Sequence, residues 1–177
     1  NQEVEIMIKE YFSEYKNIFY YQNNPSLGHD GNFLNTLSLP SSDYIWLIGD
    51  SVGLSPGSIQ EVLKIIDKFS PEIIAVNFKD RIQTPSKEYK SMMHADPKAV
   101  FDLFAWHLTQ TGVTIYSKKV IDYLKNLKIE NEKVLSNKNF PHISLIFNFL
   151  STDCSFYWIS SNLIYSSGVK DSYWRKN

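Results

Sequence analysis

The sequence predicts an α/β fold with a mainly parallel central sheet flanked by helices. Short runs of β-branched and aromatic residues, such as Tyr44–Ile48 and Ile73–Val76, alternate with longer amphipathic patterns along the chain. Of the 177 residues, 43% are apolar and 15% are aromatic, which is typical of a globular chain. We therefore expect residues 1–177 to form a single domain, with antiparallel strands confined to the later part of the chain.

The first forty residues are expected to hold two helices and a short strand. Apolar residues recur at helical spacing from Val4 to Tyr15, and a second helical pattern begins among the small and polar residues 28–32. Ile18–Tyr21 is rich in β-forming residues and ends at a turn-forming Asn-Asn-Pro, which is typical of a short strand.

The stretch Ser42–Ser58 organises the middle of the chain. Asp43–Ile48 is predicted to be a buried strand, because turn-forming residues bound a short apolar run. Gly49 permits a sharp turn after this strand, which would place Asp50 beyond the strand end. Ligands of open α/β sheets bind where strands end, so Asp50 is a candidate ligand or catalyst.

The rest of the chain continues the alternation of strands and helices. A polar loop is expected over Lys79–Asp96 and another over Asn126–Asn139, and loops of this length are often functional. The predicted strands are 73–76, 112–116 and 156–159, and the predicted helices are 58–69, 97–108, 118–127 and 141–150.

Charge and cysteine usage narrow the class of protein. Lysine and arginine together number 18 against 19 acidic residues, so the chain lacks the bulk positive charge typical of non-specific nucleic-acid binding. A lone cysteine, Cys154, excludes an internal disulfide framework and fits a reducing compartment. No apolar run approaches the ~20 residues of a membrane span. We therefore expect a cytoplasmic protein, at most peripheral to the inner face of the membrane.

Gly49-Asp50-Ser51 admits three interpretations. In the first, Asp50 is a turn or cap residue that satisfies backbone amides. In the second, Ser51 is the nucleophile of a GDSL-type esterase. That family's late Asp-x-x-His is matched here by Asn139–His142, in which an amide replaces the orienting carboxylate. Asn77 follows a strand where an oxyanion-binding residue would stand, without the glycine and aspartate of that family's motif.

The third interpretation makes Asp50 part of a sugar-nucleotide site. The motifs that support it are Leu27-Gly28-x-x-x-Asn32, Tyr44–Asp50, Leu54-x-Pro56–Ile59, Thr111–Tyr116 and Phe140–Ile146. In this order they resemble the family 2 type glycosyltransferases, especially the abequosyltransferase-like branch, over most of residues 3–165. The resemblance implies the GT-A type fold of nucleotide-diphospho-sugar transferases.

The resemblance also implies an activity and its partners. Such an enzyme transfers a sugar from a nucleotide-sugar donor to a glycan or lipid-linked acceptor in bacterial surface polysaccharide synthesis, such as O-antigen or capsule. The expected reaction is a single displacement that inverts the anomeric centre, with a divalent cation, Mn²⁺ or Mg²⁺, as cofactor. A catalytically inactive domain that keeps the fold for binding is the alternative from a different functional class.

Residues of the donor site follow from the matched motifs. Gly28, Asp30 and Asn32 correspond to the helix start that approaches the nucleotide, with simple helix capping as the alternative. Asp50 corresponds to a metal ligand, and Ser51 adds a weak neutral oxygen. The family usually has Asp-Asp-Asp at this point, whereas this chain continues with Ser51-Val52, so its metal affinity is expected to be lower.

The matched position of the catalytic base holds His142, where the family usually has a carboxylate. An imidazole of ordinary pKa serves as a general base or as a metal ligand, and capping of a buried helix is the alternative. The other histidines, His29, His94 and His107, lack the spacing of a metal cluster.

The resemblance begins part-way into the family's fold. The family starts with two strands that this sequence lacks, so the chain is expected to be an N-terminally truncated fragment of that fold. A sheet without those strands would have an unpaired edge, and we expect self-association or a homo-oligomer through that edge.

Overall fold

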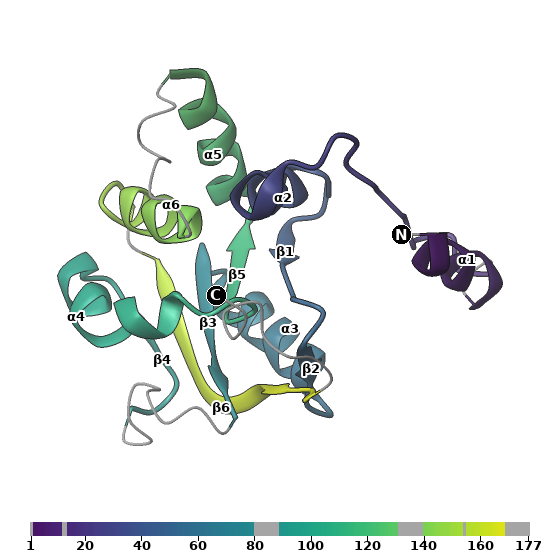
Figure 1. The fold of residues 1–177 in the computed structure, drawn as a ribbon. Helices are drawn as coiled ribbons and strands as arrows, with labels where there is room; N and C mark the ends of the chain where they lie inside the picture. Colours follow the sequence, from purple (N-terminus) through teal and green to yellow (C-terminus); the bar gives the residue numbers. More distant parts are fainter. Residues whose placement is uncertain (1, 12–13, 80–88, 131–139, 154, 169–177) are drawn as a thin grey trace.

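The computed structural model describes residues 2–11, 14–79, 89–130, 140–153 and 155–168. Within them, six strands form one sheet in the order β1-β5-β3-β6-β2, with β4 paired to β6 (Figure 1). The strands are β1 Tyr44–Trp46, β2 Val52–Leu54, β3 Ile73–Phe78, β4 Met92–His94, β5 Thr114–Ser117 and β6 Phe156–Ser166. The helices are α1 Gln2–Tyr11, α2 Gly28–Ser38, α3 Ser58–Phe69, α4 Pro97–Leu108, α5 Lys118–Glu130 and α6 Pro141–Leu150.

The sheet confirms the α/β class but not the expected strand directions. Among the described strands, β3 and β6 are parallel, whereas β1–β5, β3–β5, β2–β6 and β4–β6 are antiparallel. The prediction of a mainly parallel sheet is therefore wrong. Apolar patterns report which residues are buried, and they carry no information on the direction of a strand relative to its neighbours.

Strand β3 is the centre of the sheet. All six of its residues are buried, because β5 and β6 pair with its two edges and helices cover its faces. The polar exception in this strand is Asn77, whose Nδ2 donates to Ser160 O at 3.0 Å and whose Oδ1 accepts from Phe78 N at 2.9 Å. Asn77 therefore stabilises the sheet where the β3–β6 register shifts.

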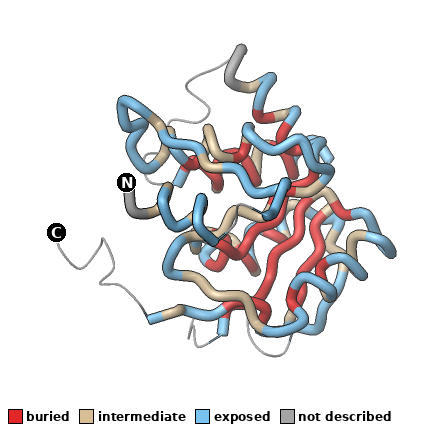
Figure 2. The backbone as a smooth tube through the Cα atoms, turned by 90° about the vertical axis from the view of Figure 1, so that its right-hand side faces the viewer, coloured by how far each residue is buried: buried red, intermediate tan, exposed pale blue. Residues whose placement is uncertain are grey.

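The ring contacts of β6 show that helices lie on both faces of the sheet. Phe156 and Trp158 contact Phe104 of α4, with ring centroids 5.2 and 5.1 Å apart. Tyr157 contacts Phe69 of α3 at 5.0 Å. Because successive strand residues point to opposite faces, α4 and α3 cover opposite sides of the sheet. Figure 2 shows the buried strands as a layer between more exposed segments.

Helices α2 and α6 join α4 on its side of the sheet. Phe101 of α4 contacts Phe147 of α6 with ring centroids 5.1 Å apart, and Phe33 of α2 lies 5.1 Å from the His142 ring of α6. Helix α6 buries seven of its ten residues, which explains why its sequence is apolar almost all round. These helices form the layer that faces the candidate site.

Most predicted helices are confirmed, and the differences concern short strands. The strand predicted at Ile18–Tyr21 is wrong: these residues form no strand, and the side chain of Phe19 is 70% exposed. β-Forming residues give a strand only where a neighbouring strand pairs with them. The predicted strand Asp43–Ile48 pairs over Tyr44–Trp46 alone. Strands β2 and β4, of three residues each, lie in stretches predicted as turn and loop.

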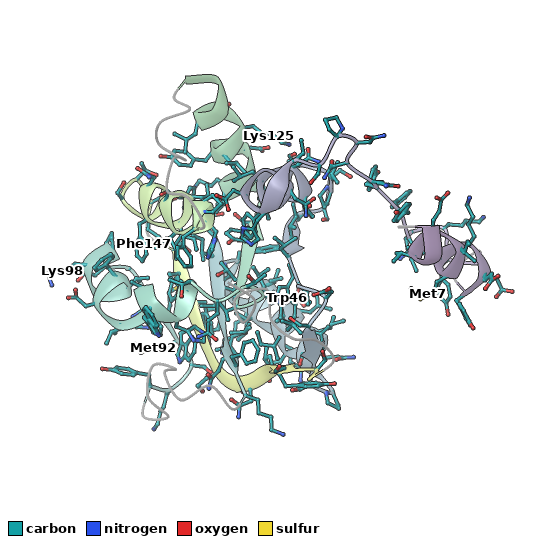
Figure 3. All side chains as sticks on the ribbon, viewed as in Figure 1. Met7, Trp46, Met92, Lys98, Lys125 and Phe147 are labelled. Carbon is teal, nitrogen blue, oxygen red and sulfur yellow. The ribbon has the colours of Figure 1, made fainter. Side chains whose placement is uncertain are left out.

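The N-terminal arm, which comprises α1 and the described residues that follow it up to Tyr21, stands apart from the rest of the molecule. Figure 1 shows α1 away from the sheet, and Figure 3 shows Met7 on this separate helix, whereas Trp46 lies within the body. Strand β1 lies at one edge of the sheet that the described strands form, and it pairs with β5. Self-association through this edge stays a prediction. Large apolar side chains exposed on the arm are Ile6, Met7, Tyr11, Tyr15, Ile18, Phe19 and Tyr21.

His107 is a buried histidine that belongs to the core. Its Nε2 donates to Val76 O at 2.9 Å, and its ring meets Trp158 edge-on at 5.2 Å. Burial lowers the pKa of His107 to about 4, although the bond to Val76 acts in the opposite direction. The ring is therefore neutral in the folded protein at pH 7.

We expect His107 to make the protein less stable in acid. The His107 ring takes up a proton near pH 6.5 in the unfolded chain and near pH 4 in the folded protein. The free energy of unfolding is therefore not reduced by this ring above pH 6.5, and it falls as the pH drops toward 4. The full loss is about 3 kcal/mol. Urea unfolding between pH 7 and 4 measures it, and His107→Gln is expected to flatten the curve. An unchanged pH dependence in this variant would contradict the assignment.

Candidate active site

The loop that carries Thr111 and Gly112 is held against the β1–β2 connection. Trp46 Nε1 donates to Gly112 O at 2.7 Å. A Cβ built on Gly49 would lie 3.6 Å from Thr111 Cγ2, and one on Gly112 would lie 3.4 Å from a Val52 methyl. Gly112 also has a φ of +93°, a conformation that favours glycine. The loop is thus fixed beside the turn that follows β1.

That turn carries Asp50 and Ser51. Val52 N donates to Gly49 O at 3.1 Å, so Asp50 and Ser51 are the two central residues of a β-turn. Both residues are exposed. The sharp turn expected at Gly49 is therefore present, and it presents the Asp50 carboxylate to solvent next to the Thr111 loop.

A small pocket lies between this loop, strand β5 and helices α2 and α6. Its volume is about 10 Å³, which is roughly the room that one water molecule needs. Phe33 and Leu47 form an apolar wall, and the polar lining residues include Gln110, Thr114, Tyr116 and His142.

Several polar atoms of the pocket residues are buried without a partner. Gln110 Oε1, Thr114 Oγ1 and both ring nitrogens of His142 make no hydrogen bond of good geometry within the described part of the chain, although the Tyr116 hydroxyl approaches Thr114. The side chains of Thr114 and His142 are 4% and 5% exposed. Buried polar atoms in native proteins are almost always paired, so this cluster stands out from the surrounding core.

His142 stands at the start of α6, directly after Pro141. Burial lowers its pKa, while Asp30 and the carbonyls of Thr109 and Leu108 raise it, and His29 lowers it further. Those carbonyls approach the ring without making a hydrogen bond of good geometry. His142 is therefore a neutral imidazole at pH 7. It makes no capping hydrogen bond to α6, which leaves the capping interpretation unsupported.

The predicted residues of α2 lie at its first turns. Asp30 Oδ1 lies 2.7 Å from His29 Nδ1, at hydrogen-bond distance, and Asp30 is close enough to His142 to raise its pKa. Asn32 Oδ1 accepts from Asn23 Nδ2 at 2.8 Å. Gly28 begins the helix with a φ of +67°. Leu27, the residue before the helix, makes no capping hydrogen bond through its side chain, whereas Ser26 Oγ accepts from Gly28 N at 3.3 Å.

The structure thus groups the predicted residues in two places. His142 and Asp30 lie at the pocket and its helical wall, and Asp50 and Ser51 lie on the turn beyond Thr111. Within the described residues the ring nitrogens of His142 make no hydrogen bond of good geometry, so His142 is not hydrogen-bonded to Ser51 as an esterase base would be. Asn139, the other residue of that motif, lies outside the described residues.

Sequence reasoning missed Gln110 and Thr114 as candidate site residues. Thr114 lies inside a predicted buried strand, between Val113 and Ile115, where a hydroxyl is unusual. That hydroxyl at a buried position was the available signal. Gln110 stands in a loop, and nothing in its neighbours marks it.

Few side chains are available to bind the expected divalent cation. Within the described ranges, no three His, Cys, Asp or Glu side chains form a group that could hold a metal ion. Asp50 offers one carboxylate, followed by the serine and valine at 51 and 52. Protein-held Mg²⁺ and Mn²⁺ need more oxygen ligands than this, so the described residues do not fit a cation held by the protein alone.

Comparisons with known proteins bear on the fold. The sequence matches no family model. It is 24% identical to abequosyltransferase RfbV of Salmonella typhimurium strain LT2 over 180 residues, which cover 90% of this chain and 51% of that protein. The structure matches S. aureus TarS 1–349 in complex with UDP, with a TM-score of 0.63, 11% identity and coverage of 94% of this chain and 47% of TarS.

A second structure of S. aureus TarS 1–349 matches with a TM-score of 0.65, 12% identity and coverage of 94% and 48%. The fold is the GT-A type α/β fold, which this chain shares with the TarS structures. The resemblance inferred from the sequence motifs is confirmed at this level. The chain spans about half the length of these relatives. No helix in the described ranges is both long and apolar enough to cross a membrane.

We expect Trp46→Phe to loosen the Thr111–Gly112 loop. The change removes the donor to Gly112 O and leaves a buried carbonyl unpaired, which costs about 1–3 kcal/mol. Urea unfolding measures the loss. Tyr44→Phe is the matched control, because it removes a hydrogen bond to Pro71 O from the same strand. The NMR signals of the His142 ring should shift in Trp46→Phe and not in Tyr44→Phe. Equal shifts in both variants would contradict the link between Trp46 and the pocket.

Proposed function

We propose that this chain is part of a glycosyltransferase that transfers a sugar from a nucleotide-sugar donor to a glycan acceptor in surface polysaccharide synthesis. The observation that carries the proposal is the GT-A type fold, with an aspartate turn beside a polar pocket at the end of β1. Two relatives support it: the curated one is named an abequosyltransferase, and the TarS structure holds UDP.

We assign the nucleotide of the donor to the Asp50 turn and the first turns of α2. Asp50 and Ser51 are exposed there, so they are open to a charged ligand without the desolvation that a buried site would require. Gly28, Asp30 and Asn32 are the α2 residues assigned to the same ligand. Asp50 remains the one proposed metal ligand, and a cation bound there would depend on phosphate oxygens for its other ligands.

The proposed reaction is a single displacement with His142 as the general base. The acceptor hydroxyl oxygen attacks the anomeric carbon of the donor sugar, and the bond from that carbon to the diphosphate oxygen breaks. The leaving nucleoside diphosphate takes the electron pair, and a ring nitrogen of His142 takes the hydroxyl proton. Attack opposite the leaving group inverts the anomeric centre. The lowered pKa of His142 keeps a nitrogen lone pair available at neutral pH.

We expect Asp50→Ala to weaken the binding of UDP in the presence of Mn²⁺. Isothermal titration calorimetry of the chain with UDP should show at least about fivefold weaker binding in the variant, equivalent to about 1 kcal/mol. The matched control is Asp67→Ala, which removes an exposed aspartate from α3. In EDTA the wild type should bind UDP no more tightly than Asp50→Ala does, because without the cation the Asp50 carboxylate repels the diphosphate.

Two results would contradict the donor site. One is a wild-type chain that binds none of UDP, CDP, GDP and dTDP, which would favour the inactive binding domain. The other is an Asp50→Ala variant that binds UDP in Mn²⁺ as tightly as the wild type and Asp67→Ala do. Loss of binding in both aspartate variants would also count against a specific role for Asp50.

A further inference from the structure

We propose that the pocket lined by Gln110, Thr114, Tyr116 and His142 binds a single hydroxyl group of a neutral sugar, with Thr114 and Gln110 as the residues that recognise it. The inference rests on the proposed function, because it assigns the sugar of that reaction to this pocket. It adds two recognition residues and the chemical class of the group they bind.

The size of the pocket fits one hydroxyl group. Its volume of about 10 Å³ is close to that of a site for one water molecule. A sugar hydroxyl occupies about the same space as a water, with the sugar ring left outside. A phosphate group has four oxygens around phosphorus and needs more room than one hydroxyl group.

The charge of the lining also favours a neutral group. Among the residues that the structure describes, no lysine, arginine, aspartate or glutamate lines the pocket. Burial keeps His142 in its neutral form by lowering its pKa, and burial raises the pKa of Tyr116, which stays protonated. An anion would therefore lose its hydration without gaining a positive partner.

The polar atoms of the lining complement a hydroxyl group. Gln110 Oε1 is an acceptor, the Thr114 hydroxyl both donates and accepts, and the neutral His142 ring donates through its one N–H, which leaves its other nitrogen for the acceptor hydroxyl of the proposed reaction. All of these atoms are buried, and in the described residues none makes a hydrogen bond of good geometry, although the Tyr116 hydroxyl approaches Thr114 and two carbonyls approach His142. A hydroxyl group donates one hydrogen bond and accepts others, so it can pair with these atoms when it enters.

The energetics distinguish a recognition site from a structural one. A buried polar atom without a partner costs about 1–3 kcal/mol, and an apolar side chain of the same shape avoids that cost. Thr114 therefore lowers the stability of the unbound protein relative to valine. Thr114→Val should be as stable as the wild type or more stable, while its affinity for the sugar falls.

The pocket also stands where the sugar of the donor would lie. Thr111, which lines the pocket, approaches Gly49, with 3.6 Å between its Cγ2 and the position of a Cβ on that glycine. Gly49 begins the turn that carries Asp50. A ligand with its diphosphate at the exposed turn could thus place a neutral hydroxyl in the buried pocket.

The test is an NMR titration of the full chain with neutral glycosides and no nucleotide. The probes are the methyl α-glycosides of glucose, galactose, mannose and rhamnose, and inorganic phosphate is the charged comparison. At least one glycoside should shift the signals of the His142 ring and the Thr114 methyl group, and phosphate should shift neither. Thr114→Val should bind that glycoside at least about tenfold more weakly than the wild type. Its midpoint of urea unfolding should be no lower than that of the wild type.

The matched control is Thr152→Val, because Thr152 lies outside the pocket and its hydroxyl donates to Phe149 O at 2.7 Å. This variant should keep the affinity for the glycoside. Gln110→Ala is a second pocket variant and should also bind the glycoside more weakly than the wild type. The test therefore holds even if Thr114→Val does not fold. The inference is overturned if no glycoside shifts the pocket signals, if phosphate shifts them, or if both pocket variants bind like the wild type.

The two proposals fail separately. If the chain binds a glycoside through Thr114 but shows no Asp50-dependent binding of UDP, the proposed donor site is contradicted and the hydroxyl pocket is not. A chain that binds UDP through Asp50 but no glycoside would overturn the pocket and leave the donor site.

Discussion

The burial of β3 between two neighbouring strands and two helical layers is the constraint on which the rest of the structure depends. All six of its residues are buried, and its parallel pairing with β6 begins with Ile73 opposite Phe156. A strand in this position must have both edges paired and both faces covered, because its amides have no access to water. The other strands and the helices α3, α4 and α6 are arranged around that requirement.

The same register positions the candidate site. Ala75 of β3 stands between Thr114 of β5 and Trp158 of β6, so these side chains share one face of the sheet. Trp158 packs against α4, which places Thr114 beneath the same helical layer. Thr114 thus lines the pocket together with Gln110 and Tyr116, and the start of α6 adds His142 to it.

The site divides its chemistry between an exposed turn and a buried pocket. Asp50 is an exposed aspartate, whereas the pocket beyond Thr111 is lined by uncharged residues and is partly open to solvent. Charged groups keep most of their hydration at the turn, and a neutral hydroxyl loses little on entering the pocket if its hydrogen bonds are replaced. This division suits a ligand with a charged diphosphate at one end and a neutral sugar at the other.

Sequence reasoning reached the helices and the buried strands but not the way they pair. The amphipathic pattern of 58–69 and the Pro97 start predict α3 and α4 correctly, because both signals are local. The direction of β5 and the pairing of β2 depend on distant residues, so no local pattern contains them. The motif comparison identified Asp50 and His142 as candidates. Thr114 became a candidate only when its unpaired hydroxyl was visible.

The most direct test of the account is the position of a bound donor sugar relative to Thr114. An isotope-filtered NOE experiment on the full chain with saturating UDP-glucose and UDP-galactose, one at a time, measures which methyl groups lie within about 5 Å of the sugar protons. For at least one donor the account predicts NOEs from the sugar ring to the Thr114 methyl group, and none to the methyl group of Thr152. Bound donors whose sugar protons show NOEs to other methyl groups and none to Thr114 would contradict it.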